Sequence, residues 1–168
     1  MHSIFTENDL EKVIIDKLCN LGYIYLNASD PWTVQRQLSD FINDSLLLEQ
    51  LQIINPNIQT DILEKAIAML KNIDNPSLFE RNHIVHKWLT DGIQVEDYHS
   101  DVNPLIRFID FDNKKNNVFQ VANQLKFKES RNLRIPDVIL FVNGIPLVIF
   151  ELKSIEFNED TFIERAYE

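Results

Sequence analysis

Two nearly continuous apolar segments, residues 137–142 and 146–152, flank the dipeptide Asn143-Gly144. Asn-Gly between apolar segments is a strong signal for a β-hairpin, because both residues accept the positive φ angles of a tight turn. Strands that are apolar on both faces belong in the middle of a covered sheet. We therefore expect a sheet whose central part includes this hairpin.

The other periodic segments predict helices around that sheet. Apolar residues at helical spacing predict a helix over 6–21, where Thr6 and Asp9 resemble a capping box and Gly22 marks the end. Further helices are expected at 33–50, 61–71 and 78–89, and further strands at 23–26, 106–111 and 118–125. Together they predict an α/β fold: a central mixed sheet flanked by helices, with a helical insertion at about 32–90.

Length and composition are those of one folded domain. The chain has 168 residues, of which 45% are hydrophobic and 25% charged, with 3 glycines and 6 prolines. No apolar segment is long enough to span a bilayer, and the first residues lack the features of a secretory signal. Cys19 is the single cysteine, so a reduced cytoplasmic setting is the simple interpretation. The chain stops inside a predicted helix at 159–168, and we interpret residues 1–168 as a single domain of a longer protein.

The net charge of −10 argues against a free-standing DNA-binding domain. The charge is unevenly distributed, however. Residues 105–154 hold eight basic and five acidic residues, a net of +3, which leaves −13 for the rest of the chain. The basic residues therefore concentrate around the predicted hairpin.

Charged groups lie at the ends of the two predicted hairpin strands, at Asp137, Glu151 and Lys153. Glu151 and Lys153 would share one face of a strand, because they are two residues apart. A strict two-residue turn would put Glu151 on the other side of the sheet from Asp137. A three-residue loop over 143–145 would bring Asp137 opposite Glu151, with Cβ atoms about 4.5–5.5 Å apart. We predict that loop, or an equivalent bulge.

Two carboxylates at that separation repel each other unless a cation lies between them. Magnesium is suitable, since it binds one or two carboxylates together with water and phosphate oxygens. The metal would neutralise charge on a phosphate and activate water, while Lys153 would orient or deprotonate that water or stabilise the transition state. These groups are suited to phosphodiester hydrolysis. The alternative is a simple acid–lysine salt bridge at a sheet edge.

Pro136-Asp137 followed by Glu151-Leu152-Lys153 matches the pattern of the PD-(D/E)xK nuclease superfamily. Over essentially its whole length, the chain also resembles the N-terminal domain of type I restriction enzyme R subunits. The segments that carry this wider resemblance are, in order, Tyr25-Leu26-Asn27, Ile54-Asn55-Pro56, residues 89–93, Asp110-Phe111, residues 121–124 and residues 137–148.

The resemblance implies a restriction-endonuclease-like fold and a Mg²⁺-dependent endonuclease acting on double-stranded DNA, with Mn²⁺ able to substitute. Asp137 and Glu151 would be metal ligands, the carbonyl of Leu152 a further ligand, and Lys153 the catalytic lysine. The superfamily often adds an acid from the first helix. Glu11 fits that role by its position, and a solvated helix-start glutamate is the alternative.

Two features separate this chain from a complete R subunit. The Gln-x-x-x-Tyr element that usually follows the Glu-x-Lys strand is absent, because the chain ends at Ala166-Tyr167-Glu168. No phosphate-binding glycine loop is present, since Gly22, Gly92 and Gly144 are the only glycines. The family implies motor domains in the missing remainder, which alone would use ATP, and modification and specificity subunits as partners.

Several other groups are candidates for functional roles. Four basic residues are candidates for phosphate contacts with DNA, with a solvated loop as the alternative: Lys126, Lys128, Arg131 and Arg134. Asn123-Gln124 is interpreted as structural, with phosphate contact as the alternative. Glu7 is the fallback for the helix acid, and His83 with His86 form a possible metal pair that lacks a carboxylate partner.

The main hypothesis is therefore a type I restriction endonuclease domain. A non-catalytic domain that docks DNA or sister subunits is an alternative with the same fold. A resolvase-like repair nuclease is an alternative with the same chemistry. Divalent metal bound by Asp137 and Glu151 would separate the first from the second, and junction-selective cleavage without ATP would favour the third.

Overall fold

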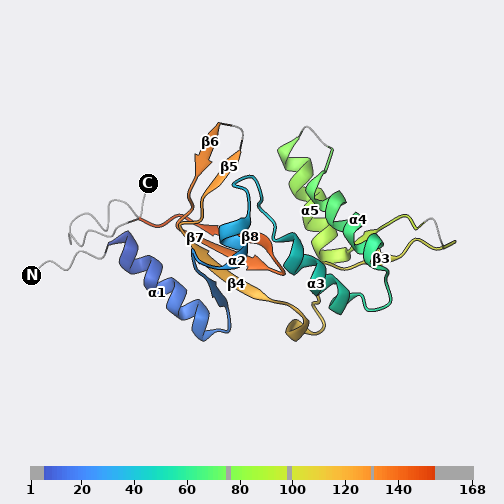
Figure 1. Cartoon of the computed structure of the whole chain (residues 1–168), viewed down its shortest axis with the longest axis horizontal. Helices are drawn as coiled ribbons and strands as arrows, with labels where there is room; N and C mark the ends of the chain where they lie inside the picture. The colour runs from blue at the N-terminus through green and yellow to red at the C-terminus, as the bar shows by residue number, and fades with distance from the viewer. Residues whose placement is uncertain (1–5, 75–76, 98–99, 130, 154–168) are drawn as a thin grey trace, which may run out of the picture. The chain divides into compact units, whose positions relative to one another are not determined.

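A computed structural model describes residues 6–74, 77–97, 100–129 and 131–153 (Figure 1). These residues divide into two compact units. Unit 1 comprises the residues up to 39, those from 121 to 140 and those from 148 onward. Unit 2 comprises residues 40–120 and 141–147.

The predicted α/β class is confirmed, with a four-stranded mixed sheet in the order β1-β4-β7-β8. Unit 1 contains α1 (Glu7–Asn20), β1 (Ile24–Leu26), α2 (Pro31–Gln35) and the antiparallel pair β5 (Phe127–Glu129) and β6 (Asn132–Arg134). Unit 2 contains α3 (Asp44–Ile54), α4 (Thr60–Lys71), α5 (Leu78–Asp91), the antiparallel pair β2 (Ile93–Gln94) and β3 (Leu105–Ile106), and a short 3₁₀ helix, η1 (Lys114–Asn116). Strands β4 (Phe119–Asn123), β7 (Val138–Val142) and β8 (Ile145–Phe150) have residues in both units. Among the described residues, no helix combines the length and apolar character that crossing a bilayer requires.

Helix α1 begins as the sequence predicts. The Thr6 hydroxyl accepts a hydrogen bond from the Asp9 amide at 3.2 Å, and the Asp9 carboxylate accepts one from the Thr6 amide at 3.1 Å. This reciprocal pair is a capping box, which satisfies amides that the helix itself leaves unpaired. The Thr6 hydroxyl, followed by the Thr6 amide, lowers the pKa of Asp9 below its ordinary value.

The single helix predicted over 33–50 is wrong. Helix α2 ends at Gln35 and α3 begins at Asp44, so the segment between them is not helical. The reason lies in Asn43, whose side chain accepts a hydrogen bond from the Leu46 amide at 3.2 Å and starts a new helix. The helices predicted at 61–71 and 78–89 are confirmed as α4 and α5.

The core of unit 2 is built mainly from α3, α4 and the strands that follow α5. Its fully buried members include Leu47, Leu51, Leu63, Ile106 and Phe108. The strand predicted at 106–111 is much shorter, because β3 ends at Ile106.

A turn replaces the remainder of that predicted strand. The Asp110 carboxylate accepts hydrogen bonds from the Asn113 amide at 2.8 Å and the Asp112 amide at 3.0 Å. The Asn113 amide contributes most to lowering the pKa of Asp110, followed by the Asn116 side chain. A carboxylate that binds the amides that follow it favours a turn over an extended strand.

The turn between β7 and β8 has two residues, so the predicted three-residue loop over 143–145 is wrong. Asn143 and Gly144 have φ angles of +53° and +80°, as a type I′ turn requires. A Cβ atom on Gly144 would lie 2.8 Å from the carbonyl oxygen of Asn43, so only glycine fits there. This close approach and the positive φ together explain why glycine occupies the second position of the turn.

Strand β8 is the last strand in the sheet order of the described residues, and it ends at Phe150. Its residues Leu147, Val148 and Ile149 are 40%, 42% and 60% exposed. The prediction of a covered interior strand is therefore wrong for β8, because an edge strand lacks a neighbour on one side. Glu151 and Lys153 lie beyond the strand rather than on it. The alternation of faces along a strand, by which a two-residue turn would separate Glu151 from Asp137, therefore does not apply to them.

Candidate functional site

Two carboxylates in unit 1 share one amide group. The Gln124 side-chain nitrogen Nε2 donates to Glu11 Oε1 at 2.7 Å and to Asp137 Oδ1 at a longer 3.3 Å. Glu11 is only 6% exposed, and Asp137 is half-buried. The fold thus brings the predicted helix acid and the predicted metal ligand to the same side chain.

The second oxygen of each carboxylate has its own donor. Asn123 Nδ2 donates to Glu11 Oε2 at 2.9 Å, and the Tyr25 hydroxyl donates to Asn123 Oδ1 at 2.7 Å. The Leu152 amide donates to Asp137 Oδ2 at 2.6 Å. Both acids are therefore held by two donors each, as buried charges require.

The secondary structure explains this convergence. Glu11 is the one buried residue of α1, and Asn123 is the last residue of β4. Gln124 follows at a φ of +50°, which is uncommon for a residue other than glycine. Its backbone amide donates to the Asp137 carbonyl at 3.1 Å, immediately before β7 begins. Hydrogen bonds therefore connect Glu11 of α1 with the end of β4 and with Asp137, directly before β7.

The other predicted site residues lie differently. Glu151 and Lys153 are exposed, and within the described part of the chain neither forms a hydrogen bond or an ion pair. Leu152 does contact Asp137, through its amide rather than the carbonyl that the resemblance implies as a ligand. Glu7 is exposed in the first turn of α1. The roles of all these residues remain predictions.

The donor groups of the site suit a hard divalent cation. Within the residues that the structure covers, no group of three or more His, Cys, Asp and Glu side chains is arranged to hold a metal, and this includes His83 and His86. Mg²⁺, however, commonly uses only one or two carboxylates and completes its coordination with water and phosphate oxygens. Glu11 and Asp137 offer two such carboxylates, each oriented by a second hydrogen bond, as ligating carboxylates usually are. The carboxylates of Glu11 and Asp137 are therefore suitable ligands for Mg²⁺.

A basic hairpin connects Gln124 to Asp137. It consists of β5 and β6, with Phe127 paired to Arg134 and Glu129 paired to Asn132 (Figure 1, orange). The four predicted DNA-binding residues are all exposed: Lys128 and Arg134 lie in its strands, Arg131 lies between them, and Lys126 directly precedes β5. Residues 125–136 hold four basic residues and one acidic residue, a net of +3 in a chain of net charge −10.

Arg36 fixes this hairpin to the rest of unit 1. Its guanidinium lies 4.6 Å from the centroid of the Phe127 ring and 5.3 Å from that of Trp32. It also donates to the Lys126 carbonyl, and the Lys128 amide donates to the Leu38 carbonyl at 2.8 Å. Sequence reasoning missed this cation–π contact, because nothing in the spacing of these residues indicates that they meet.

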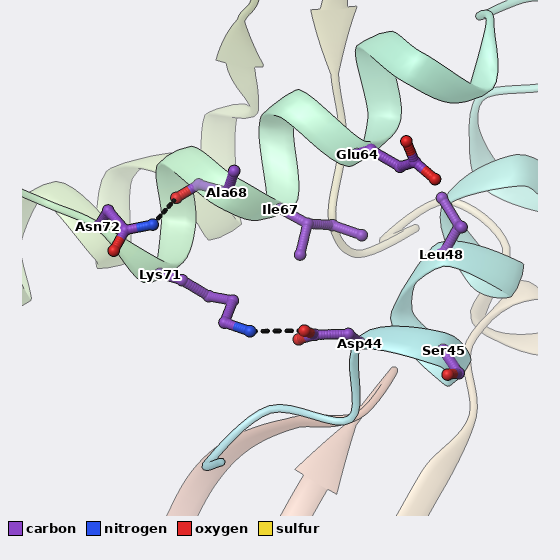
Figure 2. A pocket seen from close by; sticks show the side chains of 8 residues that line it. All are labelled: Asp44, Ser45, Leu48, Glu64, Ile67, Ala68, Lys71 and Asn72. Atoms are coloured by element: carbon purple, nitrogen blue, oxygen red, sulfur yellow. Dashed lines mark hydrogen bonds and ion pairs between the residues drawn. The ribbon is translucent and has the colours of Figure 1, made fainter. Parts of the chain in front are cut away.

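Unit 2 contains a separate pocket of about 360 Å³, lined by residues of α3 and α4 and by Asn72 (Figure 2). Lys71 reaches across it to Asp44, with Nζ 2.5 Å from Oδ2. Glu64 and the apolar side chains of Leu48 and Ile67 complete much of the lining. The lysine of this pocket is paired with Asp44, and the other charged residue of its lining, Glu64, is acidic.

Known proteins similar to this chain are restriction enzyme subunits. Residues 4–168 match the family model described as "Type I restriction enzyme R protein N terminus". The putative type I restriction enzyme MjaIXP endonuclease subunit of Methanocaldococcus jannaschii is 32% identical over 158 residues, which are 89% of this chain and 15% of that protein. The type I restriction enzyme HindI endonuclease subunit of Haemophilus influenzae is 31% identical over 159 residues, 90% of this chain and 15% of that protein.

The chain spans about 15% of the length of these curated relatives. A third, the putative MjaVIIIP endonuclease subunit of M. jannaschii, is 33% identical over 97% of this chain. Because the family model covers nearly the whole sequence, the chain belongs to the family of type I restriction enzyme R protein N termini.

Proposed function

We propose that this chain is the Mg²⁺-dependent endonuclease region of a type I restriction enzyme R subunit, which hydrolyses phosphodiester bonds of double-stranded DNA. The observation that carries the proposal is the convergence of the Glu11 and Asp137 carboxylates on one amide of Gln124. The relatives named as endonuclease subunits support the same function.

In this proposal Asp137, Glu151 and the Leu152 carbonyl hold Mg²⁺, and Glu11 adds a carboxylate from α1. When bound, the metal supplies charge neutralisation at the phosphate and a more acidic water. The Leu152 amide orients Asp137, and Asn123 with Tyr25 orients Glu11. Lys153 positions the attacking water or stabilises the negative charge that develops on the phosphate.

The hairpin of β5 and β6 is the proposed DNA contact. Lys126, Lys128, Arg131 and Arg134 would bind phosphates, which position a duplex without selecting its sequence. A two-stranded ribbon fits the width of the major groove of B-DNA. Recognition of a specific sequence would then fall to the specificity subunit, modification to its own subunit, and ATP-driven movement to motor domains elsewhere in the R subunit.

One observation favours a second function, a non-catalytic domain that docks DNA or sister subunits. Among the described residues, the side chains of Glu151 and Lys153 form no hydrogen bond or ion pair, so the Glu-x-Lys element is hydrogen-bonded to Asp137 through the Leu152 amide alone. A docking domain would retain the fold and the basic hairpin without needing those two side chains at a metal.

Calorimetric titration with Mn²⁺ and Mg²⁺ distinguishes the two functions. We expect the parent chain to bind the metal, and Asp137→Asn and Glu151→Gln to lose binding while remaining folded by circular dichroism. Asp16→Asn, which changes an exposed acid of the same charge on α1, is the control and should bind like the parent.

Equal binding by the parent and both site variants would show that the metal lies elsewhere. An absence of binding in the parent would favour the docking domain. If the parent binds as expected, cleavage of plasmid DNA by a full-length R subunit complex carrying Asp137→Asn is the next test, and we expect no cleavage.

A further inference from the structure

The Gln124 amide bonds one oxygen of each carboxylate, Glu11 Oε1 and Asp137 Oδ1, which we call the inner oxygens; the other oxygen of each carboxylate is the outer one. The outer oxygen of Glu11 is held by Asn123, and the outer oxygen of Asp137 by the Leu152 amide. Neither of those donors contacts the inner oxygens. The inner oxygens are therefore the ones positioned to serve a cation.

Among the residues that the structure describes, Gln124 is the one that bonds both inner oxygens. Its Nε2 atom lies 2.7 Å from Glu11 Oε1 and 3.3 Å from Asp137 Oδ1. Its backbone is held at a φ of +50°, and its amide is bonded to the Asp137 carbonyl. An uncommon backbone conformation that is fixed in this way places one particular side chain at one point, which is typical of functional sites.

The position of Nε2 is also suited to an oxygen ligand. Mg²⁺ holds its ligands at about 2.0–2.1 Å in near-octahedral geometry, so neighbouring ligand oxygens lie about 2.9 Å apart. The two distances from Nε2 to the carboxylate oxygens bracket that value. The terminal amide of glutamine carries an oxygen of similar size on the other side of the same carbon. Rotation of the amide by about half a turn puts that oxygen where the nitrogen lies.

We propose that Gln124 is a further oxygen ligand of the divalent cation, beside Glu11 and Asp137, with an amide that reverses on metal binding. In the structure the NH₂ group of Gln124 donates to Glu11 and Asp137 and holds them together. With a cation bound, Gln124 Oε1 would join the inner oxygens of the two carboxylates in holding it. This inference rests on the proposed function, because it requires a cation at Asp137.

The test is Mn²⁺ calorimetry combined with thermal unfolding in the presence and absence of Mn²⁺. Gln124→Met keeps the length of the side chain and removes the oxygen, so we expect affinity to fall about 10–100-fold. Gln124→Glu supplies a charged oxygen at the same place, so we expect affinity at least equal to the parent's. The Glu variant should also show a lower melting temperature without metal and a larger rise on adding Mn²⁺. Gln94→Met, an exposed glutamine in unit 2, is the control and should bind like the parent.

The direction in which Mn²⁺ affinity changes in these variants decides whether Gln124 is a metal ligand or only fills the space beside the carboxylates. If Gln124→Met binds Mn²⁺ as tightly as the parent, or more tightly, while Asp137→Asn loses binding, the inference is overturned and the proposed function stands. If the parent binds no Mn²⁺, the proposed function and this inference fail together. Should Gln124→Met not fold, Gln124→Glu decides alone: equal or tighter binding supports the inference, and weaker binding overturns it.

Discussion

Asn143 is fully buried in unit 2, and its side chain satisfies polar groups from three other positions. Nδ2 donates to the Phe108 carbonyl and to Asn117 Oδ1, both at 2.9 Å, while Oδ1 accepts from the Val118 amide at 2.8 Å. Its backbone meanwhile adopts the positive φ that the turn requires. The sequence marks this residue as part of a hairpin turn, but its second role as a buried bridge depends on contacts that spacing does not reveal.

We expect Asn143→Ala to lower the free energy of unfolding by about 3 kcal/mol, because each buried polar group left without a partner costs about 1–3 kcal/mol. Urea unfolding followed by circular dichroism measures this loss. Asn143→Gly separates the two roles, since glycine accepts the positive φ and still loses the hydrogen bonds. A loss in both variants of less than about 0.5 kcal/mol, the range of ordinary surface changes, would show that the bridge does not stabilise the unit.

Glu11 and Gln124 show how far residue-level inference extends. The position of Glu11 in the first helix identified it as a candidate, and the structure buries it beside Asp137 through Gln124. The amide of Gln124 could not be predicted, because its role follows from a positive φ after the last residue of β4. From the sequence alone, an Asn or Gln side chain with a structural role cannot be told from one with a functional role, because the difference lies in its hydrogen-bond partners.

At the level of elements, α1 carries the acid of the candidate site, so its capping bears on the site itself. The capping box of Thr6 and Asp9 fixes where the helix begins, and Glu11 lies within the next turn. The pKa of Asp9 is lowered, chiefly by the Thr6 hydroxyl. The Asp9 carboxylate therefore contributes stability above its ordinary pKa, and that contribution is lost as the pH falls through the lowered value.

We expect Thr6→Ala to raise the pKa of Asp9 toward its ordinary value of 3.8 and to cost about 1 kcal/mol of stability near neutral pH. A carboxyl-detected NMR titration of Asp9, with thermal melts of parent and variant from about pH 2 to pH 7, measures both effects. The difference between the two melting curves should shrink at the acid end, where Asp9 is protonated in both proteins. An unchanged Asp9 titration in the variant would contradict the capping assignment.

The types of most elements followed from periodicity, whereas several boundaries did not. The predictions of α1, α4 and α5 held because their apolar residues recur over several turns, and because side-chain caps begin α1 and α5. The segment 33–50 failed because one asparagine cap at Asn43 outweighed a continuous helical pattern. The strand at 106–111 failed because Asp110 binds the amides that follow it.

At the scale of the whole molecule, charge is the property that most affects DNA binding. The chain carries −10, while residues 125–136 carry +3, so all other residues together carry −13. A duplex bound through the hairpin would experience attraction from a few basic residues and repulsion from the rest of the surface. Affinity should therefore depend strongly on salt concentration.

We expect each of Lys126→Gln, Lys128→Gln and Arg131→Gln to reduce the slope of log affinity against log salt by about 1, since each removes one phosphate contact. Fluorescence anisotropy with a labelled duplex at several salt concentrations gives the slope. Lys17→Gln, an exposed lysine on α1, is the matched control and should leave the slope unchanged. Equal slopes in the hairpin variants and the control would place the DNA contact elsewhere.

The exposed strand β8 has a consequence for how such a chain behaves in concentrated solution. In the described residues it is the last strand of its sheet, and Leu147, Val148 and Ile149 are exposed along it. An apolar edge of this kind is a template on which a second chain can add a strand, which is the first step toward aggregates. Pro146 has no backbone N–H to donate, so it hinders the pairing of a second chain only near the start of the strand. A single lysine at Ile149 would place a charge on the open edge and oppose such pairing, which makes this position the natural one to change when solubility is limiting.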